Sequence, residues 1–92
     1  MIKSFRHRGL KRFYERGDTS QIDGKLRDRI QTILGVLDVS SELEGMNVPT
    51  WRLHALRGNY KGYWSVTVRA NWRIIFRFEA GNAYDVDFID YH

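Results

Sequence analysis

Three histidines are the side chains of this sequence best suited to exchange a proton near neutral pH, because imidazole has an unperturbed pKa of about 6.5. They are His7, His54 and His92. Alternation along residues 51–56 places His54 on the same side as Arg52. A surface or packed histidine without a chemical role explains His54 equally well. His7 has no acidic residue close to it in the sequence, so we expect it to be solvated.

The last three residues combine a carboxylate, a phenol and an imidazole, in Asp90, Tyr91 and His92. Chain termini are usually frayed. Here a predicted strand leads directly into these residues and should anchor them. Strict alternation would send Tyr91 to one side of that strand and its two neighbours to the other. For all three to share a site, we expect the strand to lose its regular geometry near Ile89.

These residue types indicate chemistry without a metal or another cofactor. The sequence has no cysteine, His54 and His92 lie far apart, and the acidic residues do not repeat at ligand spacings. Cleavage of RNA by its own 2′-hydroxyl needs a base, an acid and cations around the phosphorane. Imidazole and guanidinium groups supply all of them.

The positive charge of the chain is concentrated in one stretch. Of the formal net charge of +4, residues 47–78 carry six basic side chains and no acidic one, whereas residues 79–92 carry four acids and no base. The basic stretch is typical of a phosphate-binding surface. A solvated sheet face that keeps the protein soluble is an equally good interpretation of the charge alone.

Periodicity predicts a short strand at residues 1–5 and then two helices. The first helix contains Leu10 and Phe13 and ends at Gly17. Ser20 and Asp23 resemble a capping box for the second helix. The apolar stripe of that helix consists of Leu26, Ile30, Ile33, Leu34 and Leu37.

After the single proline the period changes to two. Strands are predicted over residues 51–56, 63–69, 72–79 and 83–89, joined by short turns. Alternation assigns Trp64 and Trp72 to the core, and Tyr63, Arg69 and Arg73 to an open, basic face. We expect His54 on that face as well. The fold class is therefore α+β, with two N-terminal helices on one face of a mainly antiparallel sheet. This sheet comprises a short N-terminal strand and a four-stranded C-terminal meander.

Length and composition agree with a single domain over residues 1–92. With 42% hydrophobic and 14% aromatic residues, the chain can bury one modest core. The lack of cysteine suits a reducing compartment. No stretch has the length and apolarity of a membrane span or a signal peptide, so we expect a cytoplasmic protein without a membrane partner.

The run LHALRGNYKGYWSVTVRANWRIIFRF at residues 53–78, together with the opening MIKSF and the terminal DYH, resembles HigB-type toxins of the RelE/ParE superfamily. The resemblance spans essentially the whole chain. It implies the RelE-like microbial RNase fold and a ribosome-dependent endoribonuclease that cuts A-site codons. It also implies a cognate HigA-like antitoxin with a helix-turn-helix domain, the 70S ribosome and mRNA as partners, and operator DNA reached only through the antitoxin.

The resemblance also implies roles for individual residues. His54, Asp90, Tyr91 and His92 match the acid/base group of the family, and Arg73 matches its phosphate-stabilising arginine. His92 would be the general acid and His54 or Asp90 would assist the 2′-hydroxyl, although the two histidine roles could be exchanged. Tyr91 would orient or stack a base.

A second set of residues would contact RNA without taking part in proton transfer. Arg57 stands where many relatives have lysine, so it is expected to contact phosphate and not to move a proton. Lys61 and Arg69 would bind the RNA backbone alongside it. Tyr63, if exposed, could stack a nucleotide.

Two other functions remain open at this stage. Toxins of the ParE branch share the fold but inhibit DNA gyrase by contact, without RNase chemistry. A passive RNA-binding module would use only the basic sheet face. The combination of His54 with the terminal Asp90, Tyr91 and His92 favours the nuclease, because a binding protein has no need of that set.

Overall fold

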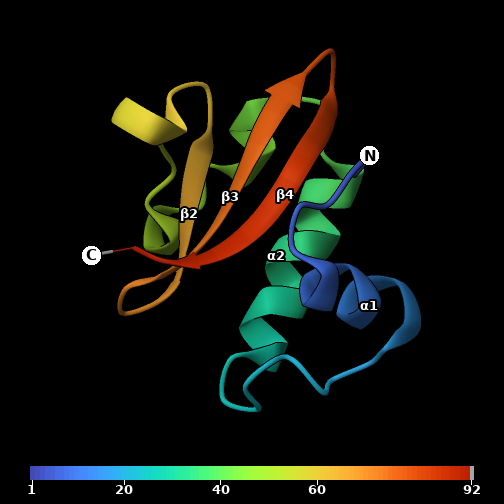
Figure 1. Cartoon of the computed structure of the whole chain (residues 1–92). Helices are drawn as coiled ribbons and strands as arrows, with labels where there is room; N and C mark the ends of the chain where they lie inside the picture. The colour runs from blue at the N-terminus through green and yellow to red at the C-terminus, as the bar shows by residue number, and fades with distance from the viewer. Residues whose placement is uncertain (92) are drawn as a thin grey trace.

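The computed structural model describes residues 1–91, and these form two helices packed on one face of a four-stranded antiparallel sheet (Figure 1). The strands follow chain order across the sheet, β1-β2-β3-β4. The predicted α+β class is therefore confirmed. The elements are α1 (Arg8–Arg16), α2 (Arg27–Val39), the 3-10 turns η1 (Leu43–Met46), η2 (Pro49–Trp51) and η3 (Gly58–Tyr60), and β1 (His54–Ala55), β2 (Trp64–Arg69), β3 (Trp72–Glu79) and β4 (Asn82–Asp90).

The main core lies between the helices and the sheet. The predicted α2 stripe is confirmed: Ile30, Ile33, Leu34 and Leu37 are fully buried against the sheet. No helix in residues 1–91 is long and apolar enough to cross a membrane.

Both helix starts differ from the sequence-based prediction. His7 is not solvated: it is half-buried, and its Nδ1 accepts a hydrogen bond of 2.9 Å from the Leu10 amide, which caps α1. The capping box predicted for α2 is wrong. The Asp23 carboxylate instead accepts from the Lys25 amide at 2.9 Å, which stabilises a turn, and α2 begins only at Arg27.

The N-terminal segment runs parallel to β4 and covers its outer edge (Figure 1). Two isolated bridges, Ile2 to Ala83 and Phe5 to Val86, replace the predicted strand. At the opposite edge, the strand predicted over residues 51–56 is reduced to two residues. It is shortened because η2 precedes it and Arg52 adopts a left-handed conformation with φ of 52°.

Two assignments near the β2–β3 turn are wrong, the first because of an irregularity in β2. The register between β2 and β3 shifts between Thr67 and Arg69, so that Val68 points into the core and Arg69 pairs with Trp72. Arg69 therefore lies on the helix side of the sheet, where it lines a hollow with Lys25. It does not lie on the face turned away from the helices, as alternation predicted. Trp72 lies on the predicted side of β3 but is not a core residue: it is 37% exposed at the start of the strand, next to the β2–β3 turn.

A bulge in β4 determines the orientation of the C-terminal residues. Ile75 pairs with Asp87 and Arg77 with Tyr84, so two residues of β4, the first of them Asp85, lie opposite Phe76. Asp85 has a φ of 53°, a conformation that aspartate tolerates better than most residues. Beyond the bulge β4 stays regular to Asp90, so the predicted loss of geometry near Ile89 is wrong.

Asp38 of α2 ties the N-terminal segment and α1 to the second helix. Its carboxylate accepts hydrogen bonds from the Ile2 amide at 2.8 Å and from the Tyr14 hydroxyl at 2.9 Å. Burial, reinforced by this hydrogen bond, raises the pKa of Tyr14 to about 12. The contact holds together three segments that are separate in the sequence.

We expect Asp38→Ala to lower the free energy of unfolding by about 1–3 kcal/mol, because it leaves two polar groups without their acceptor. Urea unfolding of this variant and the wild type at neutral pH measures the difference.

The dependence of stability on pH above 8 gives an independent test of the Tyr14 contact. An unfolded tyrosine ionises near pH 10 and folded Tyr14 only near pH 12, so its contribution is complete below pH 10 and is lost as the pH rises through 12. Urea unfolding from pH 8 to 12 should show a shallower decline for Tyr14→Phe than for the wild type; equal slopes would contradict this account.

Candidate active site

The sheet face turned away from the helices brings His54 and Arg73 together. His54 on β1 pairs with Ser65 on β2, and Ser65 pairs with Ile75 on β3, which places these residues in one row across the face. Arg73 lies two residues before Ile75 on β3 and therefore on the same face, in the next row. We call this face the open face. The placement of His54 and Arg73 agrees with the predicted alternation.

The backbone fixes the protonation pattern of neutral His54. Its Nδ1 lies 2.8 Å from the carbonyl oxygen of Arg52, and a carbonyl can only accept a hydrogen bond. The proton of the neutral ring is therefore on Nδ1, and Nε2 carries the lone pair. The left-handed conformation of Arg52 turns that carbonyl toward the ring. An exposed imidazole held in this tautomer can act as a base through Nε2.

The guanidinium of Arg73 is fixed at the turn between β2 and β3. One terminal nitrogen donates to the carbonyl oxygens of Ala70 and Trp72. Its Nε is buried and has no hydrogen-bond partner within residues 1–91, and the same is true of the Ser65 hydroxyl. Arg73 is half-buried, so its charge is less screened than that of a fully solvated arginine.

Of the described C-terminal residues Asp90 and Tyr91, which we call the tail together with His92, only Tyr91 lies on the open face. Beyond the bulge, alternation directs Ile89 and Tyr91 to the open face, and the Tyr91 amide donates to the Asn71 carbonyl at 2.8 Å. Asp90 pairs with Trp72 and lies on the opposite side of the strand. The structure thus brings Tyr91 to the face of His54 and separates Asp90 from it. His92 lies outside the described residues.

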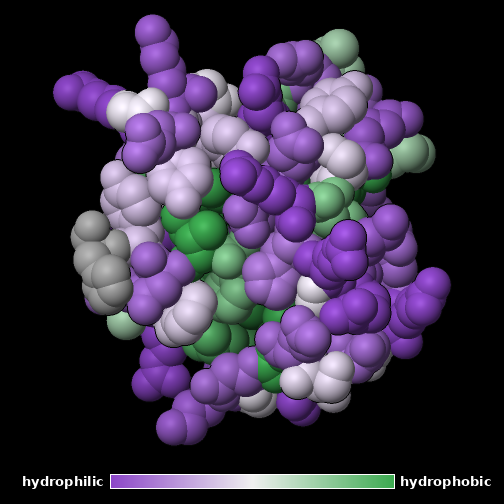
Figure 2. All heavy atoms as spheres, viewed as in Figure 1, coloured by the Kyte–Doolittle hydropathy of each residue, from purple (hydrophilic) through white to green (hydrophobic). Residues whose placement is uncertain are grey.

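The turn η3 covers part of the open face with an aromatic side chain that the sequence analysis missed. Tyr60 packs on a second, smaller hydrophobic cluster, and its ring centroid lies 6.4 Å from that of Tyr91. The second cluster consists of Leu56, Tyr63 and Ile75, with Tyr60 and Ile89 packed against it. In Figure 2 a hydrophobic area is visible over the strands of Figure 1, bordered by hydrophilic residues.

Tyr63 is part of this cluster and not an exposed stacking platform. It is only 9% exposed, its ring meets Tyr60 edge to face at 6.0 Å, and the Arg77 guanidinium lies 6.0 Å from its ring centroid. The expectation of an exposed Tyr63 is wrong, because η3 folds over it. By contrast, Arg57 and Lys61, which flank η3, are exposed.

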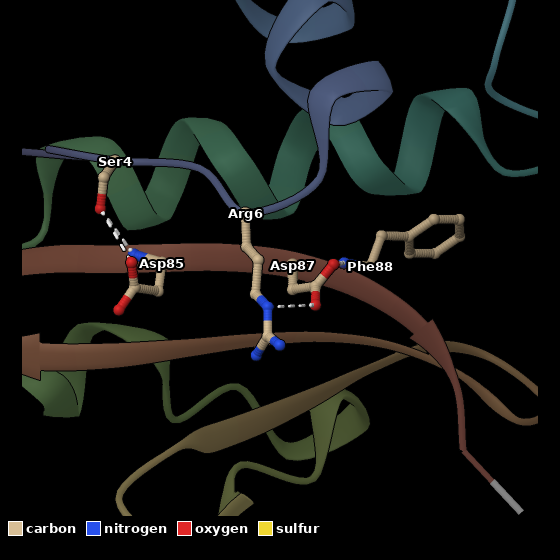
Figure 3. Close-up of polar contacts among 5 residues, drawn as sticks. All are labelled: Ser4, Arg6, Asp85, Asp87 and Phe88. Atoms are coloured by element: carbon tan, nitrogen blue, oxygen red, sulfur yellow. Dashed lines mark hydrogen bonds and ion pairs between the residues drawn. The ribbon is translucent and has the colours of Figure 1, made fainter.

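Arg6 is a cation of this region that the sequence analysis did not find. Its Nε lies 4.0 Å from a carboxylate oxygen of Asp87, the ion pair that is drawn as a dashed line in Figure 3, and its guanidinium interacts with the Tyr63 side chain. The hydrogen bond with Tyr63 and the neighbouring charges raise the pKa of Arg6 above its ordinary value. No local pattern reveals Arg6, because it reaches the open face only through the pairing of the N-terminal segment with β4.

The groups on this face suit reactions at a phosphate. Within residues 1–91 no three His, Cys, Asp or Glu side chains gather closely enough to hold a metal ion. A base, a fixed guanidinium and a phenol lie on one face, with exposed basic residues beside them. This arrangement can orient a phosphodiester and take a proton from a neighbouring hydroxyl.

Comparison with known proteins identifies the family of this chain. A family model described as the RelE-like toxin HigB of type II toxin–antitoxin systems matches residues 3–92. The chain belongs to the HigB-like toxin family. As a HigB-like toxin it is the toxin of a type II toxin–antitoxin pair, as the resemblance predicted. A curated relative, Endoribonuclease HigB of Proteus vulgaris, is 48% identical over 92 residues, which cover 100% of both chains.

The contact between Tyr60 and Tyr91 gives a structural prediction for this HigB-like toxin. Tyr60→Ala should speed amide hydrogen exchange at Tyr91, because the tail loses its aromatic neighbour, while Tyr60→Phe should leave the exchange rate close to that of the wild type. Tyr84→Ala truncates a tyrosine elsewhere on the same sheet and serves as the matched control. Equal exchange at Tyr91 in all four proteins would show that Tyr60 does not hold the tail.

Proposed function

We propose that this chain is a ribosome-dependent endoribonuclease that cuts mRNA in the A site by metal-free attack of the 2′-hydroxyl and so inhibits translation. The observation that carries the proposal is His54, whose Nδ1 is held by the Arg52 carbonyl so that the lone pair is on Nε2, on the same sheet face as Arg73. The 48% identity to a protein named as an endoribonuclease supports the reaction class.

The first step of the proposed reaction is removal of the 2′-hydroxyl proton by Nε2 of His54. The oxygen then attacks the adjacent phosphorus, and negative charge develops on the phosphorane oxygens. Arg73 is in position to stabilise that charge, because its guanidinium is already fixed by two carbonyls and needs little reorganisation. Asp90 lies on the other side of β4, so we assign the base role to His54 and not to Asp90.

In the second step the bond between phosphorus and the 5′-oxygen breaks, which leaves a 2′,3′-cyclic phosphate. His92 is the proposed general acid that protonates the leaving 5′-oxygen. Its neighbour Tyr91 is anchored through the Asn71 carbonyl and is 37% exposed on the open face, where it can orient or stack a base of the substrate. Asp90, at the end of β4, is proposed to help position the tail. In this proposal His54 and His92 each transfer one proton, whereas Arg73, Tyr91 and Asp90 stabilise or position the reacting groups.

The proposed partners follow from the family and the surface charge. A type II toxin has a cognate antitoxin. We infer a HigA-like helix-turn-helix antitoxin, through which the pair contacts operator DNA, with the 70S ribosome and mRNA as targets in the cytoplasm. The exposed Arg57 and Lys61 border the open face and can contact RNA phosphates.

The test is primer extension on an mRNA translated in a purified system, comparing the wild type with His54→Ala and Arg73→Ala. Removal of one charge-stabilising donor typically slows such reactions by about 10²–10³-fold, and loss of a positioned base by about 10²–10⁴-fold. Lys3→Ala, an exposed lysine on the N-terminal segment, is the control. Intact mRNA with the wild type would refute the nuclease and direct attention to DNA gyrase; cuts without ribosomes would refute the ribosome requirement.

Arg73→Lys tests whether the fixed guanidinium, beyond its charge, is needed. Lysine keeps the charge but lacks the planar fork that contacts the Ala70 and Trp72 carbonyls while facing substrate. Its cleavage rate should lie between those of the wild type and Arg73→Ala, with little change in the concentration of ribosomes needed for half-maximal rate. A rate equal to that of the wild type would mean that any cation suffices.

A further inference from the structure

The tip of the β2–β3 hairpin presents an aromatic ring on the helix side of the sheet, away from His54. Trp72 stacks on Phe88, with ring centroids 4.8 Å apart and an interplanar angle of 21°. Phe88 stacks on the indole, and Trp72 remains 37% exposed beside a hollow that it lines with Lys25 and Arg69. A tryptophan held by a stacked neighbour and partly exposed at a hollow has the form of a stacking platform.

Basic side chains surround this ring on the same side. Arg69, which the β2 irregularity turns away from the open face, lines one hollow with Lys25 and Arg29 and a second hollow with Lys25 and Trp72. All three cations are exposed. Asp23 is the one acidic residue of the described chain that lines either hollow. We call Lys25, Arg29, Arg69 and Trp72 the hairpin-tip surface.

This combination matches the chemistry of a single RNA strand. A base offers a flat face for the indole, and its phosphates offer charge to the lysine and arginines. The apolar part is a single ring, which is small for the buried centre of a stable protein interface. Asp90 pairs with Trp72 on this side as well, so three cations face two acids, and the net positive charge favours a polyanion.

We propose that the hairpin-tip surface binds unpaired RNA, with a base on Trp72 and the backbone on Lys25, Arg29 and Arg69. The inference rests on the proposed function in taking RNA as the partner, and adds a contact outside the open face. Trp72 precedes Arg73 in β3, and their side chains point to opposite faces. An RNA strand passing around this end of the sheet can therefore contact both.

The experiment uses a 5′-fluorescein, fully 2′-O-methylated oligonucleotide, which lacks the attacking hydroxyl and cannot be cut by this mechanism. Anisotropy should report binding that weakens about tenfold in Trp72→Ala and much less in Trp72→Phe. Lys25→Gln with Arg69→Gln should weaken binding and reduce the slope of log affinity against log salt by about 1.4, the value for two phosphate contacts.

Arg8→Gln with Lys11→Gln, on the exposed side of α1, removes the same charge elsewhere and is the matched control. Melting curves establish that each variant is folded. The proposal would be overturned if both hairpin-tip variants kept the affinity of the wild type and its slope of log affinity against log salt. It would also be overturned if these values changed only as much as in the α1 control. Loss of binding to the cognate antitoxin with RNA affinity intact would also overturn it and identify the surface as a protein interface.

Two further comparisons complete the test. The first distinguishes ribosomal RNA from mRNA as the bound strand, and the second distinguishes failure of this proposal from failure of the nuclease proposal. If Trp72→Ala weakens binding to ribosomes equally with and without mRNA, the strand is ribosomal; weakening only with mRNA identifies the messenger. A wild type that binds the oligonucleotide through Trp72 but cuts no translated mRNA would refute the nuclease and leave this surface standing. Cleavage by the wild type with Trp72-independent binding in every arm would refute this surface alone.

Discussion

The bulge in β4 is the constraint on which the geometry of the candidate site depends. It adds one residue opposite Phe76 and so reverses which side chains of the rest of the strand face the core. Without it, alternation would direct Tyr91 to the helix side and Asp90 to the open face. The left-handed Asp85 is stabilised from outside the sheet: its amide donates to the Ser4 hydroxyl at 2.8 Å, as drawn in Figure 3.

The N-terminal segment therefore has more than one structural role. It covers the edge of β4, which would otherwise expose unpaired backbone groups, and its Ser4 supports the bulge. It also carries Arg6 to the margin of the open face. Because Asp38 of α2 binds both the Ile2 amide and Tyr14, the position of this segment is linked to the packing of the helices. The helical layer thus influences a site that it does not touch.

The two faces of the sheet meet at the β2–β3 hairpin. The Asn71 carbonyl there anchors the Tyr91 amide, Arg73 is directed to the open face, and Trp72 is directed to the helix side. A small hydrophobic cluster under η3 gives the open face its own rigid base, so that Tyr60 can pack beside Tyr91. Local order at the site thus comes from short contacts within the sheet and its turns and not from the main core.

The sequence by itself determined the fold class, the α2 stripe, three of the four strands and the placement of His54 and Arg73 on one face, because these follow from periodicity within short segments. Tertiary structure decided the side of Arg69 and Asp90, since one extra residue in a strand reverses every later side chain. It also decided the exposure of Trp72, which lies at the start of β3 next to the β2–β3 turn. Arg6 reaches Tyr63 only because residues 1–5 pair with β4, a contact between segments about eighty residues apart that no local pattern encodes.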